Sequence, residues 1–275
     1  MQSAAAFTRM RAEAAAPEID MYQFSGGQER LAAAEHLTAS LGPLPNLANV
    51  PASLKDPGGQ WVTFAVIAEG ILYRTDKVKT PPTSYKDFLD PAYHGHIAFP
   101  TISNGYGADF LVMMARAYGG SVTDIQPGFQ AISKIAKGAT IFQAASQVPE
   151  LFAQSDIWVI PYDSAWAKHC RDAGLPVAFV APKEGSPASF CTTCIARKSK
   201  NVDVARAAVN QFISISSQAA IAEQLNWSPT NTSVRLPATL ASQLPKPDQL
   251  VILDEKAVTQ HLPQWTERWN RMIAG

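Results

Sequence analysis

Two cysteines three positions apart, Cys191 and Cys194, first suggest chemistry, because a Cys-x-x-Cys pair can form a redox disulfide or hold zinc. The surrounding segment 190–196 is apolar and β-branched, which predicts a strand. Residues three apart in a strand lie about 10 Å apart on opposite faces, whereas a disulfide needs Cα atoms within about 7 Å. A zinc site would need further ligands at suitable spacing, and the sequence offers none. We therefore interpret both cysteines as small residues of the core or of a cleft wall.

The remaining reactive residue types form no recognisable catalytic set. The five histidines fall in predicted helices or surface strands, and no serine or cysteine stands beside a plausible base. The sequence has no Gly-x-Ser-x-Gly turn and no P-loop. His94 and His96 alternate along a strand and could face one metal ion, but a surface pair is the simpler interpretation. We expect no catalytic residue, no metal site and no cofactor, with an enzyme as an alternative class.

Two glycine-containing loops are the best candidates for holding a ligand. Ser25 and Gly26 follow a predicted strand and precede a predicted helix. Ser103, Asn104 and Tyr106 repeat this arrangement further along the chain. Backbone N–H groups at a helix N-terminus, with a serine hydroxyl, can bind an anion or a polar oxygen, and a tyrosine can hydrogen-bond or stack on a ligand. An ordinary helix cap is the alternative for the first loop.

Helical and strand patterns alternate along the chain, which predicts an α/β protein. In the helix expected at 28–41, one face carries Leu31, Ala34, Leu37 (or Thr38) and Leu41, and Gly42 ends the helix. The other expected helices are 108–120, 128–139, 202–217 (with Val204, Ala208, Val209, Phe212 and Ile213 on one face) and a C-terminal helix with Leu262, Trp265, Trp269 and Met272 on its packing face, and the expected strands are 18–24, 62–73, 96–100, 139–142, 156–161, 176–181 and 190–196.

The overall composition narrows the function classes. The chain has 275 residues, with 47% hydrophobic and 17% charged residues, which is enough apolar material for a core. Lys+Arg and Asp+Glu both number 23, so the chain has no basic excess for nucleic acid or a membrane surface. No apolar stretch approaches the ~18 residues of a membrane span. Arg9 and Arg11 interrupt the first residues, which do not form a secretory signal as written.

Five segments, in this order, resemble the periplasmic solute-binding proteins of ABC importers, in the branch of polyamine, ferric-iron and phosphonate or sugar-phosphate binders. They contain a proline-led Thr-Ser-aromatic turn, an Asp-Pro-x-Tyr-x-Gly-x-Ile-Ala strand and a Pro-x-Glu-Gly turn. The resemblance covers roughly residues 18–235, and its order is more specific than any single motif. The segments are 73–100, 101–107, 156–185, 194–214 and 225–234.

The resemblance implies a type 2 periplasmic-binding fold, with two α/β lobes that close on a ligand in the cleft between them. It makes residues 1–71 the first part of lobe 1, 72–187 lobe 2, and 188–240 the return to lobe 1. Residues 241–275 are then C-terminal helices packed on the lobes. It also implies that the chain begins after the family's first strand, helix and second strand, so that lobe 1 is N-terminally truncated and has an unpaired sheet edge.

The resemblance assigns further ligand contacts. It places contacts at Tyr162 and Asp163, where Asp163 is equally suited to cap the following helix. Gln143 and Ser146 become part of a loop that lines the cleft. Trp61 lies where a strand crosses toward the cleft, with a core position as the alternative.

The implied function is the substrate-binding component of an ABC transporter, which delivers a small polar solute to permease subunits in the membrane. The implied location is the periplasm, and we expect a monomer that binds no nucleic acid. The two helix N-termini favour a ligand with an anionic group. A polyamine is the alternative, although Gln143 and Gln147 stand where polyamine binders carry acids. The ferric-iron branch uses adjacent tyrosines, which this sequence lacks, and a ligand-sensing domain on the same fold is a further class.

Overall fold

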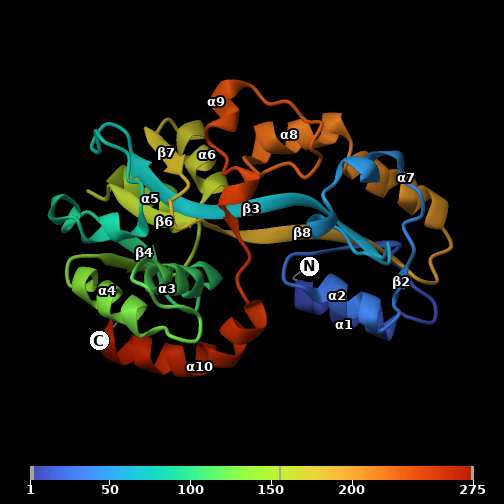
Figure 1. Cartoon of the computed structure of the whole chain (residues 1–275), viewed down its shortest axis with the longest axis horizontal. Helices are drawn as coiled ribbons and strands as arrows, with labels where there is room; N and C mark the ends of the chain where they lie inside the picture. The colour runs from blue at the N-terminus through green and yellow to red at the C-terminus, as the bar shows by residue number, and fades with distance from the viewer. Residues whose placement is uncertain (1–2, 155, 274–275) are drawn as a thin grey trace. The chain divides into compact units, whose positions relative to one another are not determined.

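Two long strands, β3 (Trp61–Arg74) and β8 (Ser186–Ala196), carry the chain between two structural units (Figure 1). The computed structural model describes residues 3–154 and 156–273. The crossings between the units, expected near residues 71 and 187, fall after Ile67 and Ala188. Unit 1 consists of Met1–Ile67 and Ser189–Leu240, and unit 2 consists of Ala68–Ala188 and Ala241–Gly275.

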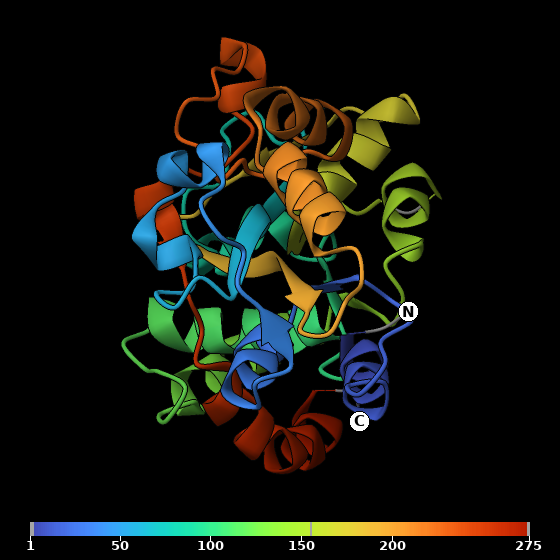
Figure 2. The same cartoon turned by 90° about the vertical axis from the view of Figure 1, so that its right-hand side faces the viewer.

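Unit 1 is built on β8, which pairs antiparallel with β1 (Met21–Phe24) and β2 (Thr38–Ala39). Figures 1 and 2 show α1 (Ser3–Ala12) and α2 (Gln28–Ala34) on one side of these strands and α7 (Val202–Phe212) on the other. Because side chains alternate along a strand, Cys194 packs in the cluster beneath α1 whereas Cys191 packs in the cluster beneath α7. Both cysteines are buried and free. The unit also contains η1 (Pro45–Asn49), η2 (Ala52–Leu54) and α8 (Ile215–Leu225).

Two of the expected helices in unit 1 were wrong in extent. The helix expected at 28–41 ends at Ala34, because His36 takes a left-handed conformation (φ 56°) and the chain turns into β2. Leu31, expected on its packing face, is 52% exposed. The helix expected at 202–217 ends at Phe212, and the hydroxyl of Ser214 caps a new helix, α8. Val204, expected on the apolar face, is 71% exposed.

A buried polar network centred on Gln218 joins the parts of unit 1. Gln218 is completely buried on α8, and its Nε2 donates to the carbonyls of Phe64 and Phe212. Its Oε1 accepts from the backbone N–H of Thr230 at 2.6 Å and of Asn231 at 3.3 Å. One side chain therefore forms hydrogen bonds with backbone groups of β3, of the end of α7 and of the loop after α8.

Unit 2 is built on the second half of β3, which pairs antiparallel with β6 (Val159–Asp163) and β7 (Val177–Val180). β4 (Ala98–Pro100) and β5 (Thr140–Phe142) form a parallel pair. The helices are α3 (Gly105–Ala117), α4 (Gln126–Ala136), α5 (Gln147–Gln154), α6 (Ser164–Asp172) and α10 (Glu255–Met272), and the short elements are η3 (Tyr85–Leu89), η4 (Pro91–Tyr93), η5 (Pro247–Gln249) and β9 (Leu250–Val251), with α9 (Ala238–Ala241) at the unit boundary.

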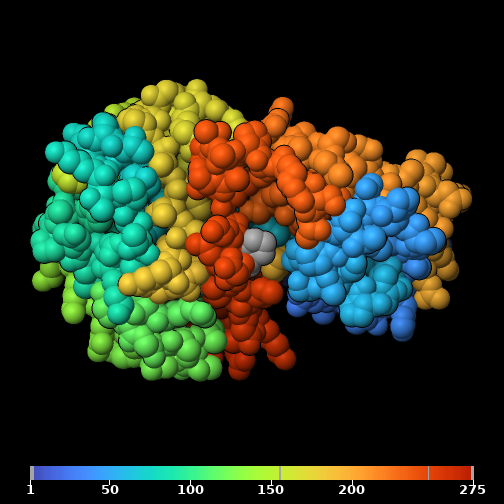
Figure 3. All heavy atoms as spheres, turned by 45° about the horizontal axis from the view of Figure 1, so that its top comes forward, coloured from blue at the N-terminus to red at the C-terminus, as the bar shows by residue number. Residues whose placement is uncertain are grey.

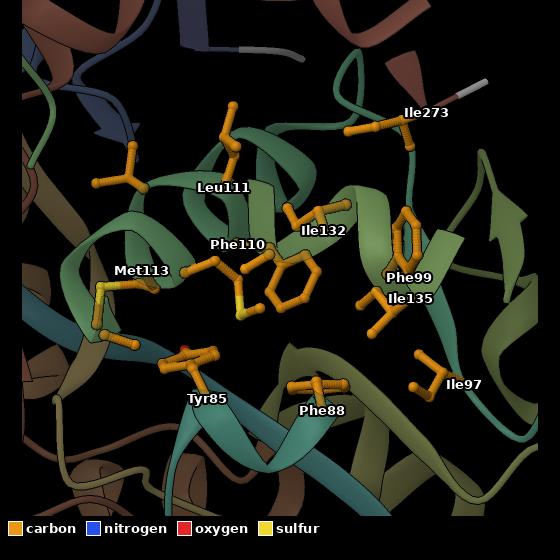
Figure 4. Close-up of a cluster of buried hydrophobic side chains, with 14 of the residues drawn as sticks. Tyr85, Phe88, Ile97, Phe99, Phe110, Leu111, Met113, Ile132, Ile135 and Ile273 are labelled. Atoms are coloured by element: carbon orange, nitrogen blue, oxygen red, sulfur yellow. The ribbon is translucent and has the colours of Figure 1, made fainter. Parts of the chain in front are cut away.

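The core of unit 2 lies between α3, α4 and η3. Figure 4 shows Phe110 of α3 among side chains from α4, η3 and β4. Helix α10 packs beside α4 (Figures 1 and 3), and its Trp265 and Trp269 are buried as predicted. Met272, expected on the same face, is 40% exposed. The labelled side chains of this core are Tyr85, Phe88, Ile97, Phe99, Phe110, Leu111, Met113, Ile132, Ile135 and Ile273.

The Pro-x-Glu-Gly turn is tied to the Thr-Ser-aromatic turn by one carboxylate. Glu184 accepts hydrogen bonds from the Ser84 hydroxyl and, at 3.1 Å, from the Tyr85 N–H at the start of η3. Ser84 also caps η3 through the Lys86 N–H. The two motifs therefore form one structural feature, which explains why they occur together.

We expect Glu184→Ala to lower the unfolding free energy by about 1.5–3 kcal/mol, because it removes hydrogen bonds to a charged group and leaves the Tyr85 N–H without this acceptor. Urea unfolding followed by circular dichroism measures the loss. Glu267→Ala, at an exposed position of α10, serves as the control and should change little. Equal stability of the two variants would contradict a structural role for Glu184.

Candidate functional site

Five of the ten predicted ligand-binding residues gather in unit 2, where β4, β6 and α3 meet. Asn104 precedes α3 and donates through Nδ2 to the Gln143 carbonyl at 3.1 Å and to the Tyr162 hydroxyl at 3.5 Å. The rings of Tyr106 and Tyr162 lie 4.4 Å apart between centroids. Asp163 ends β6, and the nearby Tyr106 hydroxyl favours the ionised form of its carboxyl. The structure thus brings these side chains into one group, which we call the unit 2 cluster.

The local sequence dictates how α3 presents its residues. Asn104 caps the helix by accepting from the Tyr106 N–H at 3.2 Å, which leaves Tyr106 on the first turn. Gly107 permits a close approach, because a Cβ there would lie 2.2 Å from the Thr101 carbonyl oxygen. The helix therefore starts tightly against the end of β4, and Tyr106 is held beside β6.

Asp163 caps a helix from a deeply buried position. Its Oδ1 accepts from the Ala165 N–H at 2.9 Å and from the Trp166 N–H at 3.4 Å, at the start of α6. Its side chain is nearly fully buried, and burial raises its pKa to about 6 despite these hydrogen bonds. The cap interpretation of Asp163 is therefore confirmed, while its direct contact with a ligand stays a prediction.

Two further carboxyl groups belong to the unit 2 cluster and were not predicted. Glu69 of β3 stands directly opposite Asp163 of β6, so their side chains share one face of the sheet. Asp109 lies three residues after Tyr106 on α3, where its carboxylate accepts from the protonated carboxyl of Glu69. Burial, followed by the charge of Asp109, raises the pKa of Glu69 well above its ordinary value. Burial also raises the pKa of Asp109 to about 6.

The unit 2 cluster has a surplus of negative charge. Among the ion pairs of the described residues, none includes Glu69, Asp109 or Asp163. Glu255, at the start of α10, adds a further negative charge that raises the pKa of Asp109. Asp109 and Asp163 are ionised above about pH 6, and their buried charges cost stability unless a cation or several hydrogen-bond donors join them.

The other two predicted residues of unit 2 lie at its surface. Ser103 and Ser146 are exposed, and within residues 3–154 and 156–273 neither hydroxyl has a hydrogen-bond partner. The backbone N–H groups of Gln143 and Ala144 already have an acceptor within the loop, because they donate to the side-chain oxygen of Gln147. These serines stay predictions as ligand contacts.

The Ser25 loop of unit 1 has an internal partner and an acidic neighbour. The Ser25 N–H donates to the Ser3 hydroxyl at 3.2 Å, and Gly26 is exposed beside it. Helix α2 has only seven residues. Its first turn holds the buried Glu29, which accepts from the Thr192 hydroxyl at 3.2 Å and whose pKa is raised by burial. A carboxyl at this helix start disfavours an anion.

Trp61 is a core residue. It is 7% exposed and packs in the cluster beneath α1, with the Arg30 guanidinium 5.9 Å from its ring centroid. Of its two interpretations, the core position is the one the structure shows.

Neither a metal centre nor a membrane span is found in the described chain. Residues 3–154 and 156–273 contain no group of three His, Cys, Asp or Glu side chains placed to hold a metal ion. Among the described helices, none combines the length and the apolar character that crossing a membrane requires.

A family model described as bacterial extracellular solute-binding protein matches residues 1–246. One curated relative, Iron uptake protein A1 of Synechocystis sp., is 33% identical over 72 residues, which are 26% of this chain and 20% of the relative. That match therefore spans about a fifth of the length of the relative.

Solved structures match almost the whole chain. An extracellular solute-binding protein from Bordetella parapertussis superimposes with a TM-score of 0.86 at 21% identity, covering 99% of this chain and 88% of that one. A spermidine/putrescine ABC transporter substrate-binding protein from Streptococcus pneumoniae gives a TM-score of 0.79 at 16% identity, covering 96% and 89%. The mixed α/β periplasmic-binding-protein fold is thereby confirmed.

Proposed function

Because the chain belongs to the bacterial extracellular solute-binding proteins, a family that binds and does not convert its solutes, we propose that it captures a small amine-bearing solute for an ABC importer. In this proposal the chain works in the periplasm as a monomer and passes the solute to permease subunits in the membrane. The observation that supports the amine is the gathering of Glu69, Asp109 and Asp163 in the unit 2 cluster.

The chemistry of the unit 2 cluster suits an ammonium group. Asp163 is nearly fully buried, and a cation is the partner that compensates a buried carboxylate most strongly. Asp109, Asn104 and Tyr106 are partly exposed, so they can meet a ligand that arrives from solvent. Tyr106 adds a partly exposed aromatic ring, which attracts an ammonium group through its ring electrons.

A ligand with an anionic group is the second candidate, and it rests on the start of α3. Ser103 and Gly105 are exposed there, and the helix dipole favours negative charge. The first turn of the same helix faces Asp163 through Tyr106, and Asp109 follows on the next turn. We place the amine ahead of the anion because full carboxylate charges outweigh the partial charge of a helix end.

Isothermal calorimetry with a compound panel tests the ligand class. We expect spermidine or putrescine to bind at least ten times more tightly than glucose 6-phosphate or phosphonoacetate, which corresponds to about 1.4 kcal/mol. Sodium chloride titration is the control for nonspecific attraction, because screening weakens a surface contact far more than a buried one.

Tighter binding of the anions than of the amines would contradict the proposed amine ligand. If an anion of the panel binds more tightly than every amine, the start of α3 provides the dominant contact and the carboxyl groups play a structural part. Conversion of any panel compound by the purified protein would reject the binding function itself.

A further inference from the structure

A hollow on unit 1 is lined by side chains that take no part in the unit 2 cluster. It consists of two adjoining hollows, of about 380 and about 600 Å³, which share His36 and Gln60. Both are of the size that small ligands occupy. We call them together the unit 1 hollow, and its polar and aromatic lining consists of Arg30, His36, Thr38, Gln60, Trp61 and Arg197.

The turn after α2 brings two basic side chains to one edge of the hollow. His36 has a left-handed backbone, which directs the chain into β2 beside the end of β8. The Arg197 N–H donates to the Leu37 carbonyl at 2.9 Å, and its guanidinium donates to the His36 carbonyl at 3.2 Å. These two hydrogen bonds therefore fix the position of Arg197, just after the end of β8, beside His36.

Gln60 offers a hydrogen-bond donor from the floor of the hollow. Its Oε1 accepts from the hydroxyl of Thr38 at 2.6 Å, and Thr38 is 5% exposed. Its backbone N–H donates to Asp56 Oδ2 at 3.0 Å, which fixes the main chain at this point. Since the amide oxygen is engaged by Thr38, the amide NH₂ is the part that can serve a ligand.

The charges of the hollow favour an anion. Arg30, Arg197 and His36 contribute donors, against the single carboxylate of Asp56. Within the described residues, Arg197 forms no ion pair, and the carboxylate recorded beside Arg30 is that of Glu29 at 3.6 Å. Arginine forks are well matched to carboxylate and phosphate oxygens.

The remaining lining is largely apolar. Ala33 and Pro57 contribute to it together with the small exposed part of Trp61, which is 7% exposed and has the Arg30 guanidinium 5.9 Å from its ring centroid. Such a lining accepts a flat apolar group by burial.

We propose that the unit 1 hollow binds a small organic anion with a carboxylate or phosphate head on a flat apolar body. Arg197, His36 and Gln60 hold the head, and the body lies against the apolar lining of Ala33, Pro57 and the exposed part of Trp61. The hollow shares no residue with the unit 2 cluster, so this binding is separate from capture of the transported solute.

Matched acid and amide probes test the charge requirement. We expect indole-3-acetate to bind, with indole-3-acetamide at least tenfold weaker, in calorimetry on the full chain at pH values where the acid is ionised. Arg197→Ala should weaken indole-3-acetate about tenfold, or about 1.4 kcal/mol by the standard conversion. Arg235→Ala, an exposed arginine elsewhere in unit 1, is the matched control and should leave this affinity unchanged.

Two further measurements identify the preferred anionic head group and test whether the unit 1 hollow is separate from the site that binds the amine. Phenyl phosphate against indole-3-acetate shows which head is preferred, and inorganic phosphate binding as tightly as phenyl phosphate would overturn the apolar wall. Saturating spermidine should not displace indole-3-acetate, and displacement would overturn the separate site. Equal affinities for the acid and the amide, or an unchanged affinity of Arg197→Ala, would overturn the proposal altogether.

Discussion

Asp109→Asn is expected to make the protein more stable and a weaker binder of amines. At about pH 7.5 the variant should gain roughly 2 kcal/mol in unfolding free energy, because a pKa raised by about two units makes the charged form costly in the fold. The same change removes a negative charge from the unit 2 cluster. We expect the affinity for spermidine to fall about ten- to hundredfold, since one partner of a largely desolvated charge pair is lost.

The pH dependence of stability follows from the raised pKa values. Asp109 and Asp163 both have pKa values of about 6 in the folded protein, above their ordinary value of 3.8. Between these limits the folded state holds more protons than the unfolded state, so stability falls as the pH rises from about 4 to about 7. Asp109→Asn should reduce this slope, and its gain over the wild type should shrink toward about pH 4.

Thermal unfolding across this pH range and calorimetry with spermidine measure both effects. Asp124→Asn is the matched control, because Asp124 is exposed in unit 2 and the same substitution there should change neither quantity. A variant that is less stable than the wild type at neutral pH would show that Asp109 is compensated by a partner in the ligand-free protein. Unchanged spermidine affinity would separate Asp109 from the ligand.

Gln218→Leu is expected to cost about 3–5 kcal/mol of unfolding free energy, a large share of the 5–15 kcal/mol that holds a typical domain together. Leucine has a similar volume but no polar atoms, so the effect comes from hydrogen bonds and not from a cavity. The carbonyls of Phe64 and Phe212 and the N–H groups of Thr230 and Asn231 would lose this partner in a buried place.

Urea unfolding measures the loss, with Gln224→Leu on the same helix as the matched control. Gln224 is exposed, so its substitution should change stability by less than about 0.5 kcal/mol. A loss below about 1 kcal/mol for Gln218→Leu would mean that water or a shifted backbone replaces the network.

Local sequence patterns predicted the secondary-structure elements better than they predicted which residues contact one another in the fold. The cap at Asp163 and the long strand β3 follow from short-range rules, and the structure confirms them. The helix expected at 28–41 failed because its apolar period continues into β2, where pairing with β8 decides the conformation. Strand pairing between residues far apart in the sequence cannot be predicted from a short stretch of sequence.

The acidic character of the unit 2 cluster escaped prediction for the same physical reason. Glu69 stands in an otherwise apolar strand, and Asp109 follows a glycine-rich loop at the start of a helix, so each looks like an isolated charge. Their meeting with Asp163 depends on the register between β3 and β6, which joins distant parts of the chain. A single carboxyl inside a buried strand was the available signal, because such a residue needs a partner or a function.

Because the three native cysteines are buried, a single introduced cysteine can be labelled selectively with a probe. Cys170, Cys191 and Cys194 are buried and free, and burial raises each thiol pKa to about 12. Since the thiolate is the reactive form, alkylating dyes should leave all three untouched in the folded protein. A cysteine introduced at exposed Ser103 would then be the preferred labelling point, and its fluorescence could report events at the start of α3 without removal of any native thiol.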